Sequence, residues 1–516
     1  MRLNRHSLSY LSFVYKDRYV FLSAVVIIAF ILGLSLAYGA FALLAPLLWM
    51  LLVLLLHECS DADLLMGSWA FGFSYLCTST YWFAYPLHDM LGVPWYACMI
   101  LLACAFALVA CFWCLPFIVH RAFSQRFSIG LLSLPWLFTS FEFLRGFTIF
   151  ALPWTWVGYT VLYIPLLKQI IPYTGVFISG YLLIHFACFL MHTVIGSKTM
   201  MRFYAVFFAG LMLFYLHLPP TLIKADRHLP LQIIQANMTV EDKLSDNYRR
   251  YAERLLSSSS DALTIFPEAS MSLAFNTEDD RLLFLEYLKP YSGIIGLSYV
   301  ANDAPKHHID LVGFGDVSGI HHKQYLVPFG EYIPGLSAVL PWLRPFIADD
   351  LYNNMRPFIH APMQSTQISL LDYRNILSYP FLCYEAFFPP ISSTVQSRSH
   401  LNIIAVENAW YRASIFHNLM VAVSRFQAIQ SLKTTILSSN RGPSMVITPK
   451  GNIARQTVFD QQDTLSSNVV LYQGRPYYHS GYDSVIIAGF VVYEWLCLFF
   501  TMIWIHYAKR LFTRKN

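Results

Sequence analysis

Residues 375–385 read Asn-Ile-Leu-Ser-Tyr-Pro-Phe-Leu-Cys-Tyr-Glu, a short apolar run that ends at Cys383. Apolar runs of this length are typical of buried strands. A nucleophile at a strand end, on a tight turn, exposes its sulfur and leaves backbone N–H groups free to hold an oxyanion. The run therefore predicts a thiol placed for chemistry at the end of a strand.

Cys383 also stands apart from the other cysteines of the chain. Of nine cysteines, the other eight lie in or beside long apolar runs, where a cysteine is most simply a small apolar residue. Exported domains usually pair their cysteines or do without them. A single thiol in a polar region is therefore either buried filler or a reactive nucleophile, and position alone leaves both readings open.

Two further strand ends supply charged partners for this thiol. Residues 261–268 read Asp-Ala-Leu-Thr-Ile-Phe-Pro-Glu and end in Glu268, and residues 322–331 carry Lys323 and Glu331 around a loop with proline and glycine. A carboxylate beside a thiol can take its proton as a general base. A nearby ammonium favours the thiolate and stabilises a tetrahedral intermediate. The residue types predict acyl transfer through a thioester.

Composition places much of the chain in a membrane. Of its 516 residues, 56% are hydrophobic and 13% are charged, whereas soluble domains carry about 25% charged residues. Spans of roughly 20 apolar residues are expected at eight places: 19–37, 39–57, 64–87, 94–119, 128–148, 165–194, 200–218 and 484–508. The sequence thus predicts a transmembrane bundle over 1–220, a polar domain over 227–480, and a final span with its tail over 484–516.

The distribution of basic residues predicts an orientation. Lysines and arginines precede the first expected span and follow the fourth, sixth and last. Positive loops stay in the cytoplasm, so both termini are expected there and the polar domain on the opposite, periplasmic side. No basic stripe interleaved with aromatic residues appears in the polar domain, and nucleic-acid binding is not expected.

Glu268, Lys323 and Cys383, in this order and on strand ends, resemble the Glu-Lys-Cys triad of the nitrilase superfamily. The resemblance implies an αββα sandwich, for which residues 231–237 would form the first strand. Two stretches narrow the resemblance to apolipoprotein N-acyltransferases. One is Leu-Val-Pro-Phe-Gly-Glu-Tyr-Ile-Pro over 326–334; the other is Glu-Phe-Leu-Arg over 142–145, followed by Pro-Trp at 153–154 and Gly-Tyr at 158–159.

The resemblance implies a role for each matching residue. Glu268 would be the general base, Lys323 the oxyanion stabiliser and Cys383 the nucleophile. The accessory or substrate-positioning residues would be Glu331, Tyr384, Glu385, Trp410 and Asn440, and the backbone N–H of Tyr384 would complete the oxyanion hole.

The implied enzyme sits in the bacterial inner membrane and works as a monomer. It moves an acyl chain from a phospholipid to the amino terminus of a diacylated apolipoprotein. Departures from the family pattern at Leu244, Glu407 and Gln430 leave room for a diverged paralogue that binds lipid or lipoprotein without turnover. A membrane-anchored amidase, in which water completes the second step, is the other alternative.

Two further expectations come from the residues themselves. The histidine pairs at 307–308 and 321–322 lack convincing spacing for metal ligands, so neither a metal nor a cofactor is expected. Residues 336–346 are apolar and aromatic within the polar domain, and Trp342 and Phe346 are expected to form an arm that admits lipid to Cys383; core packing is the alternative.

Overall fold

The computed structural model describes residues 12–89, 92–126, 132–148, 151–217, 224–239, 242, 262–270, 278–300, 307–328, 331–332, 368–390, 392–474, 477–478 and 483–513. The chain divides into two compact units. A helical unit comprises 1–81, 96–220 and 481–516, and a sandwich unit comprises 82–95 and 221–480. Segment 82–95 groups with the polar domain, although the sequence analysis placed residues 82–87 and 94–95 within two expected spans.

The helical unit contains a described helix in each of the eight ranges where a span is expected. These are α2 (Arg18–Ser35), α4 (Ala45–Glu58), α5 (Asp61–Thr80), α7 (Trp95–Arg126), α8 (Ser133–Arg145), α10 (Ile171–Ile195), α11 (Lys198–His217) and α18 (Asp483–Thr513). Shorter elements join them: α1 (Ser12–Lys16), α3 (Gly39–Ala42), α9 (Pro165–Lys168) and the 3-10 helices η3 (Pro153–Thr155) and η4 (Val157–Tyr163).

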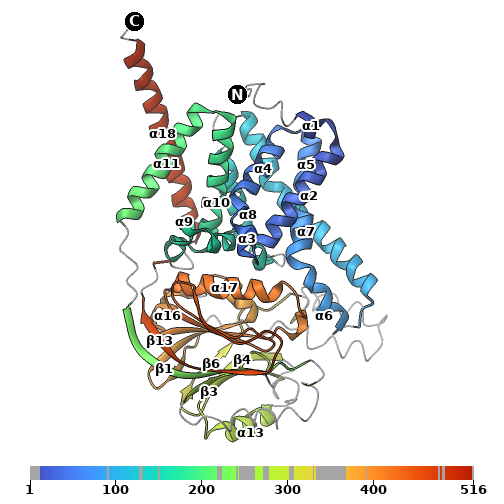
Figure 1. Ribbon diagram of the computed structural model, residues 1–516, viewed down its shortest axis with the longest axis vertical. Coiled ribbons are helices and arrows are strands. Elements are labelled where there is room, and N and C mark those ends of the chain that lie inside the picture. Colours follow the sequence, from blue (N-terminus) through green and yellow to red (C-terminus); the bar gives the residue numbers. More distant parts are fainter. Residues whose placement is uncertain are drawn as a thin grey trace. The chain divides into compact units, whose positions relative to one another are not determined.

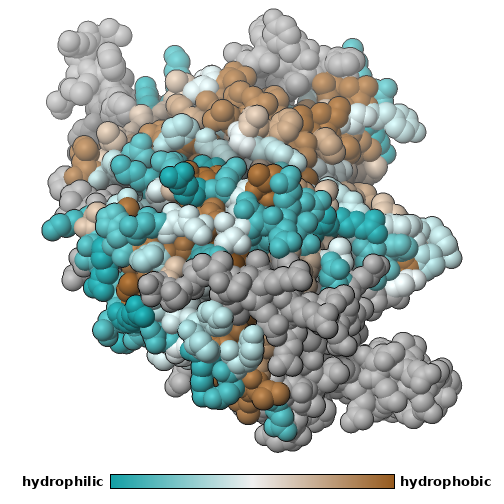
Figure 2. All heavy atoms as spheres, turned by 60° about the horizontal axis from the view of Figure 1, so that its bottom comes forward, coloured by the Kyte–Doolittle hydropathy of each residue, from teal (hydrophilic) through white to brown (hydrophobic). Residues whose placement is uncertain are grey.

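Four of these helices are long and apolar enough to cross a bilayer: 18–35, 95–125, 171–195 and 198–216. Ala45–Glu58 and Ile487–Ile503 are apolar but shorter. The structure thus supports a membrane bundle without confirming the expected count of eight spans. Figure 2 shows apolar side chains gathered over the helical unit. Many large apolar residues there are exposed, among them Phe30, Leu108 and Phe499, as expected for a surface covered by lipid.

Buried polar groups tie the helical unit together. A side-chain oxygen of Glu142 on α8 accepts a hydrogen bond from the backbone N–H of Val157 at 3.2 Å, and Arg145 donates to the hydroxyl of Thr155 at 3.1 Å. These contacts hold the segment that contains η3 and η4 against α8. Gly158 makes the same segment fit, because a Cβ there would lie 1.8 Å from the carbonyl oxygen of Val176 on α10. These contacts favour a packing role for this part of the family signature.

The sandwich unit contains two sheets within the described residues (Figure 1). The six-stranded sheet runs β13 (Asp463–Gln473), β1 (Lys224–Gln235), β2 (Leu263–Ile265), β3 (Gly293–Val300), β4 (His307–Phe314), β6 (Ile320–His322). The seven-stranded sheet runs β12 (Ile453–Gln456), β11 (Met445–Ile447), β10 (Thr434–Ser439), β9 (Leu401–Val406), β8 (Ile376–Leu382), β7 (Leu371–Tyr373), β5 (Val317–Ser318).

The two sheets pack face to face over one apolar core. Leu231, Ile265 and Leu311 of the first sheet share this core with Leu382 and Ile403 of the second. Helix α13 (Glu278–Leu288) covers the outer face of the six-stranded sheet through an apolar cluster of its own. Helices α16 (Ser393–Arg398) and α17 (Phe416–Ser431) lie on the other side of the sandwich (Figure 1). The layers are α, β, β, α, as the resemblance to the nitrilase superfamily implies.

Strand direction gathers the functional residues. β1, β2 and β3 are parallel neighbours in one sheet, as are β8, β9 and β10 in the other. In parallel sheets ligands bind beyond the carboxyl ends of the strands. Glu268 follows β2 and Cys383 follows β8. The chain thereby places a carboxylate and a thiol just beyond the carboxyl ends of strands in the two sheets.

Candidate active site

Lys323 sits at the centre of a buried cluster of charges. It follows β6 directly, and its backbone N–H donates to the carbonyl of Ile309 on β4 at 2.9 Å. Its Nζ donates to Oε1 of Glu268 at 2.7 Å and to Oε1 of Glu331 at 2.5 Å. Burial alone would lower the pKa of Lys323, but the charges of Glu268, Glu331 and Cys383 raise it well above its ordinary value. The lysine is therefore a permanent ammonium between two carboxyl groups.

The two carboxyl groups have different second partners. Oε2 of Glu268 accepts the backbone N–H of Glu407, which follows β9, at 3.1 Å. Oε2 of Glu331 accepts the backbone N–H of Val327 at 2.9 Å, within its own loop. Burial raises the pKa of Glu331, Lys323 lowers it and the charge of Glu268 raises it again, with a net rise. The two carboxyl groups thus share one cation.

Cys383 begins the 3-10 helix η8 (Cys383–Phe387), directly after β8, with φ at 47°. A residue other than glycine costs free energy in this left-handed region, and such residues cluster at functional sites. The side chain is buried, with 5% of the residue exposed. Burial raises the pKa of the Cys383 thiol well above its ordinary value. The charge of Glu268 raises that pKa further, and Lys323 opposes the rise. The resting group is therefore a protonated thiol.

Glu385 fastens the cysteine turn to the lysine loop. One carboxylate oxygen accepts the backbone N–H of Leu382 at 2.8 Å, and the other accepts the backbone N–H of Gln324. Nε2 of His321, on β6, lies 2.9 Å from the first oxygen. Burial would raise the pKa of Glu385, but His321 and the backbone N–H groups lower it overall. Glu385 thus bridges the neighbours of Cys383 and Lys323.

The remaining expected residues lie around this centre with different contacts. Tyr384 is buried and packs its ring edge-on against Phe388 at 5.0 Å. Trp410 is half-buried in the 3-10 helix η9 (Ala409–Tyr411). The Asn440 side-chain amide donates to the carbonyl of Met238 at 2.8 Å and to Glu407 at 3.0 Å. Asn440 therefore braces the loop after β1 rather than reaching the thiol.

Several expected positions fall elsewhere. Trp342, Phe346 and Leu244 lie outside the described residues, so the expected lipid-admitting arm stays a prediction. Gln430 is buried near the end of α17. Glu407 departs from the family pattern, yet its side chain accepts the N–H of Ala409 at 2.8 Å and its own N–H bonds to Glu268.

Sequence reasoning did not single out Tyr411. Its side chain is buried, and burial followed by the negative charges of Cys383 and Glu331 raises the pKa of its hydroxyl well above its ordinary value. The ring packs on Phe416 at 4.0 Å and edge-on against Trp82 at 4.8 Å. No sequence motif marks this contact, because Trp82 and Tyr411 are separated by more than half of the chain.

The turn that carries Tyr411 is held by segment 82–95. The Arg412 guanidinium donates to both carboxylate oxygens of Asp89, in the helix α6 (Ala84–Asp89), at 2.9 and 2.6 Å. It also lies over the rings of Tyr85 and Trp95, at 5.4 and 5.5 Å from their centroids. Segment 82–95 thus belongs to the wall around Tyr411.

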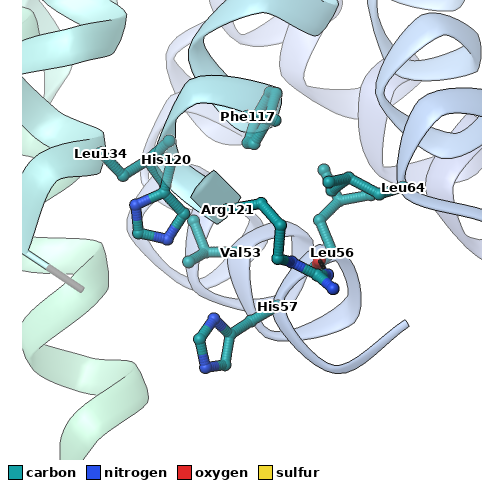
Figure 3. Close-up of a pocket in the computed structure, with 8 residues that line it drawn as sticks. All are labelled: Val53, Leu56, His57, Leu64, Phe117, His120, Arg121 and Leu134. Atoms are coloured by element: carbon teal, nitrogen blue, oxygen red, sulfur yellow. Dashed lines mark hydrogen bonds between the residues drawn. The ribbon is translucent and has the colours of Figure 1, made fainter. Parts of the chain in front are cut away.

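A separate small pocket lies wholly within the helical unit (Figure 3). Arg121 of α7 reaches across it and donates to the carbonyl oxygens of Leu56 at 2.8 Å and Cys59 at 3.1 Å. His57 and His120 also line it. Arg121 here satisfies carbonyls at the end of α4, and the pocket contains none of the expected catalytic residues.

Comparison with known proteins follows the same division of the chain. Residues 23–189 match the family described as apolipoprotein N-acyltransferase N-terminal domain. An apolipoprotein N-acyltransferase of Azotobacter vinelandii is 27% identical over 460 residues, which cover 84% of this chain and 86% of that protein. One from Vibrio vulnificus is 24% identical over 488 residues, covering 90% and 92%. Over most of its length, the chain is thus similar to apolipoprotein N-acyltransferases.

The similarity to named apolipoprotein N-acyltransferases indicates that this chain is an acyltransferase. A further apolipoprotein N-acyltransferase, of Pseudomonas syringae pv. tomato, is 24% identical over 469 residues, covering 86% of this chain and 90% of that protein. Among solved structures, a CN-hydrolase superfamily protein of Xanthomonas campestris matches with a TM-score of 0.35 and 14% identity. That match covers 47% of this chain and 91% of the other.

Proposed function

We propose that this chain takes an acyl chain from a phospholipid as a thioester on Cys383 and passes it to the amino terminus of a diacylated apolipoprotein. The supporting observation is the buried cluster in which the Lys323 ammonium donates hydrogen bonds to Glu268 and Glu331. In the same cluster, the charge of Glu268 raises the pKa of the Cys383 thiol. The substrates are those that the names of the relatives suggest.

In the first half-reaction, Glu268 takes the thiol proton as the sulfur of Cys383 attacks the ester carbonyl of the phospholipid. A C–S bond forms, and the Lys323 ammonium and the N–H of Tyr384 stabilise the negative oxygen of the intermediate. The C–O bond then breaks. The departing lysophospholipid oxygen receives the proton from Glu268, and a thioester remains on the enzyme.

In the second half-reaction, the α-amine of the diacylglyceryl-cysteine of the apolipoprotein attacks the thioester carbonyl. Glu268 takes a proton from the nitrogen as the C–N bond forms. The C–S bond breaks, and the leaving sulfur regains that proton. The cycle therefore begins and ends with a Cys383 thiol, which agrees with the raised pKa of that group.

The membrane setting of the reaction is part of the proposal. The apolar helices support membrane association, and the distribution of lysine and arginine supports cytoplasmic termini. The sandwich unit would then work on the periplasmic side of the inner membrane, as a monomer, where phospholipid and lipoprotein both reach it. An engineered cysteine at the exposed position Ile453 tests on which side of the membrane the sandwich unit lies. We expect an impermeant maleimide to label it in intact spheroplasts. Labelling only after lysis would overturn this orientation.

The decisive test is acyl-enzyme formation. Purified protein in detergent is mixed with a phospholipid that carries a labelled acyl chain, then denatured and analysed by gel and mass spectrometry. Label is expected on Cys383, removable by hydroxylamine, and absent from Cys383→Ala. Cys104→Ala is the control, because that thiol is exposed and lies on α7 in the helical unit.

Two outcomes would separate this proposal from its alternatives. No label from any phospholipid, with the protein folded, would overturn the phospholipid donor and favour an amidase or a non-catalytic paralogue. Label that is released to water but never to a diacylated lipopeptide would retain the thioester and overturn the acceptor.

A further inference from the structure

Three side chains with metal-ligating atoms meet on the outer face of the six-stranded sheet. His308 and Asp310 lie on β4 and His322 on the edge strand β6 (Figure 1). The antiparallel register places Asp310 directly opposite His322. Ile309 and Leu311, which alternate with the two β4 residues, point into the core between the sheets, so His308 and Asp310 share the opposite face.

The geometry of this group is close to that of a coordination shell. One ligand atom from each residue lies within 4.8 Å of the other two. Nδ1 of His322 lies 2.7 Å from Oδ1 of Asp310, and the rings of His308 and His322 have centroids 6.2 Å apart. Ligands about 2 Å from one tetrahedral ion lie roughly 3.3 Å apart. The separations in this group are thus close to those between the ligands of one ion.

The side chains of this group differ in their exposure to solvent. The Asp310 side chain is 1% exposed, whereas the His322 side chain is 49% exposed. A buried carboxylate is costly unless a positive partner compensates it. The exposed side chain of His322 gives an ion a route from solvent, and the buried Asp310 carboxylate would be its anionic ligand.

We propose that His308, Asp310 and His322 bind a divalent transition-metal ion, for which zinc is the best fit. Two imidazole nitrogens and one carboxylate oxygen suit zinc and its neighbours in the series, whereas magnesium and calcium prefer oxygen ligands alone. Binding displaces the proton between His322 Nδ1 and Asp310 Oδ1, which is released to solvent, and a water molecule fills the open position. This step rests on the geometry alone and not on the proposed function.

The site would fasten the strand that carries the central lysine. His322 is followed directly by Lys323, whose N–H bonds to Ile309, the residue between His308 and Asp310. An ion that joins β4 to β6 therefore holds the end of β6 one residue before Lys323. That positioning consequence does rest on the proposed function.

The sequence alone pointed away from a metal, and strand geometry explains why. Neighbouring residues of a strand point to opposite faces. Within the pair at 321–322, His321 turns inward to Glu385 while His322 turns outward to Asp310. The ligand set is thus spread over two strands, and no local spacing motif reveals it.

Metal content of the full chain tests the site. Tag-free protein in detergent is stripped with EDTA, dialysed against zinc chloride or magnesium chloride, and assayed by mass spectrometry for bound metal. Wild type is expected to retain about one zinc ion per chain and no magnesium. His308→Ala and His322→Ala should each bind zinc roughly 100-fold more weakly. His228→Ala should match wild type, because that histidine is exposed on β1 of the same sheet.

A second measurement distinguishes the loss of the metal site from misfolding of a variant. Zinc should raise the midpoint of thermal unfolding of wild type by about 5 °C. It should not raise that of His322→Gln, whose amide can still bond to Asp310. Zinc retention by the His308→Ala, His322→Ala double variant equal to that of wild type would overturn the proposal. So would a wild type that retains no zinc.

Discussion

Buried carboxylates occur in both units of the molecule, but their neighbours differ. In the helical unit, Glu142 accepts a backbone N–H, and Glu494 accepts the hydroxyl of Tyr181 at 2.9 Å. In the sandwich unit, Glu268 and Glu331 share a buried ammonium. Each of the first two carboxylates makes a hydrogen bond to a neighbouring segment, and Glu494 also lies 3.4 Å from Nε2 of His185. Glu268 and Glu331 instead meet at one ammonium, an arrangement typical of functional sites. We therefore infer that the role of a buried glutamate depends on the groups that contact its carboxylate.

The largest effect is expected at Glu268. Glu268→Gln keeps the size of the side chain, and its amide oxygen can still accept from Lys323. Only the bond from the N–H of Glu407 to the second oxygen is lost, so the fold should persist. It removes the group that we propose as the acceptor of the thiol proton, and the rate of acyl-enzyme formation should fall about 1000-fold. The initial rate of Cys383 labelling measures this. A rate within threefold of wild type would contradict the role assigned to Glu268.

Glu385 should show an intermediate effect, because it acts through its neighbours. Glu385→Gln would turn an amide N–H toward the N–H of Leu382 or Gln324, so labelling of Cys383 should fall roughly 30-fold. The pKa of Glu385 is lowered in the folded protein. Its stabilising contribution is therefore present above its unfolded pKa of about 4.3 and is lost as pH falls through the folded pKa.

This pH dependence can be checked by thermal unfolding of wild type and Glu385→Gln between about pH 5.5 and pH 3.5. These pH values bracket the unfolded pKa. Wild type should lose stability more steeply at the acidic end. Parallel curves would mean that the carboxylate is not held in its charged form by His321 and the backbone.

Lys433 tests whether the role of a buried charged group depends on its neighbours or on the unit in which it lies. It lies in the sandwich unit, yet its ammonium bonds to the backbone carbonyls of Ser399 and Ser397. Burial lowers its pKa to about 8, below the ordinary value of about 10.4. The unfolded chain then binds more protons between these values, so stability should rise with pH by about 2 kcal/mol from pH 8 to 10. Chemical denaturation of wild type should show this rise, and Lys433→Met should lack it.

The smallest effect is expected at Glu142, the counterpart of Glu268 in the helical unit. Glu142→Gln can still accept the N–H of Val157, so the loss of stability should be about 1 kcal/mol. The rate of Cys383 labelling per folded molecule should stay within about twofold of wild type. A large loss of labelling with an unchanged unfolding midpoint would give Glu142 a direct role and remove the contrast between the units.

Much of the site could be predicted from sequence, because local patterns carry it. Apolar runs that end in Pro267-Glu268 and at Cys383 mark strand ends, and β2 and β8 end beside those residues. Contacts between distant strands could not be predicted in the same way. His321 on Glu385, and Trp82 on Tyr411, depend on register and on the return of a remote segment. The sequence also expected the segment around Trp82 to belong to the membrane bundle, since its composition is aromatic and apolar.

Segment 82–95 also affects how the sandwich domain can be produced for experiments. Trp82 is 1% exposed and packs against Tyr411 and Phe416, and Asp89 neutralises Arg412. A recombinant polypeptide cut to 221–480 would leave these aromatic faces and the arginine bare. Such a preparation should aggregate in detergent-free buffer. A synthetic peptide of residues 82–95, added during refolding, should restore its solubility.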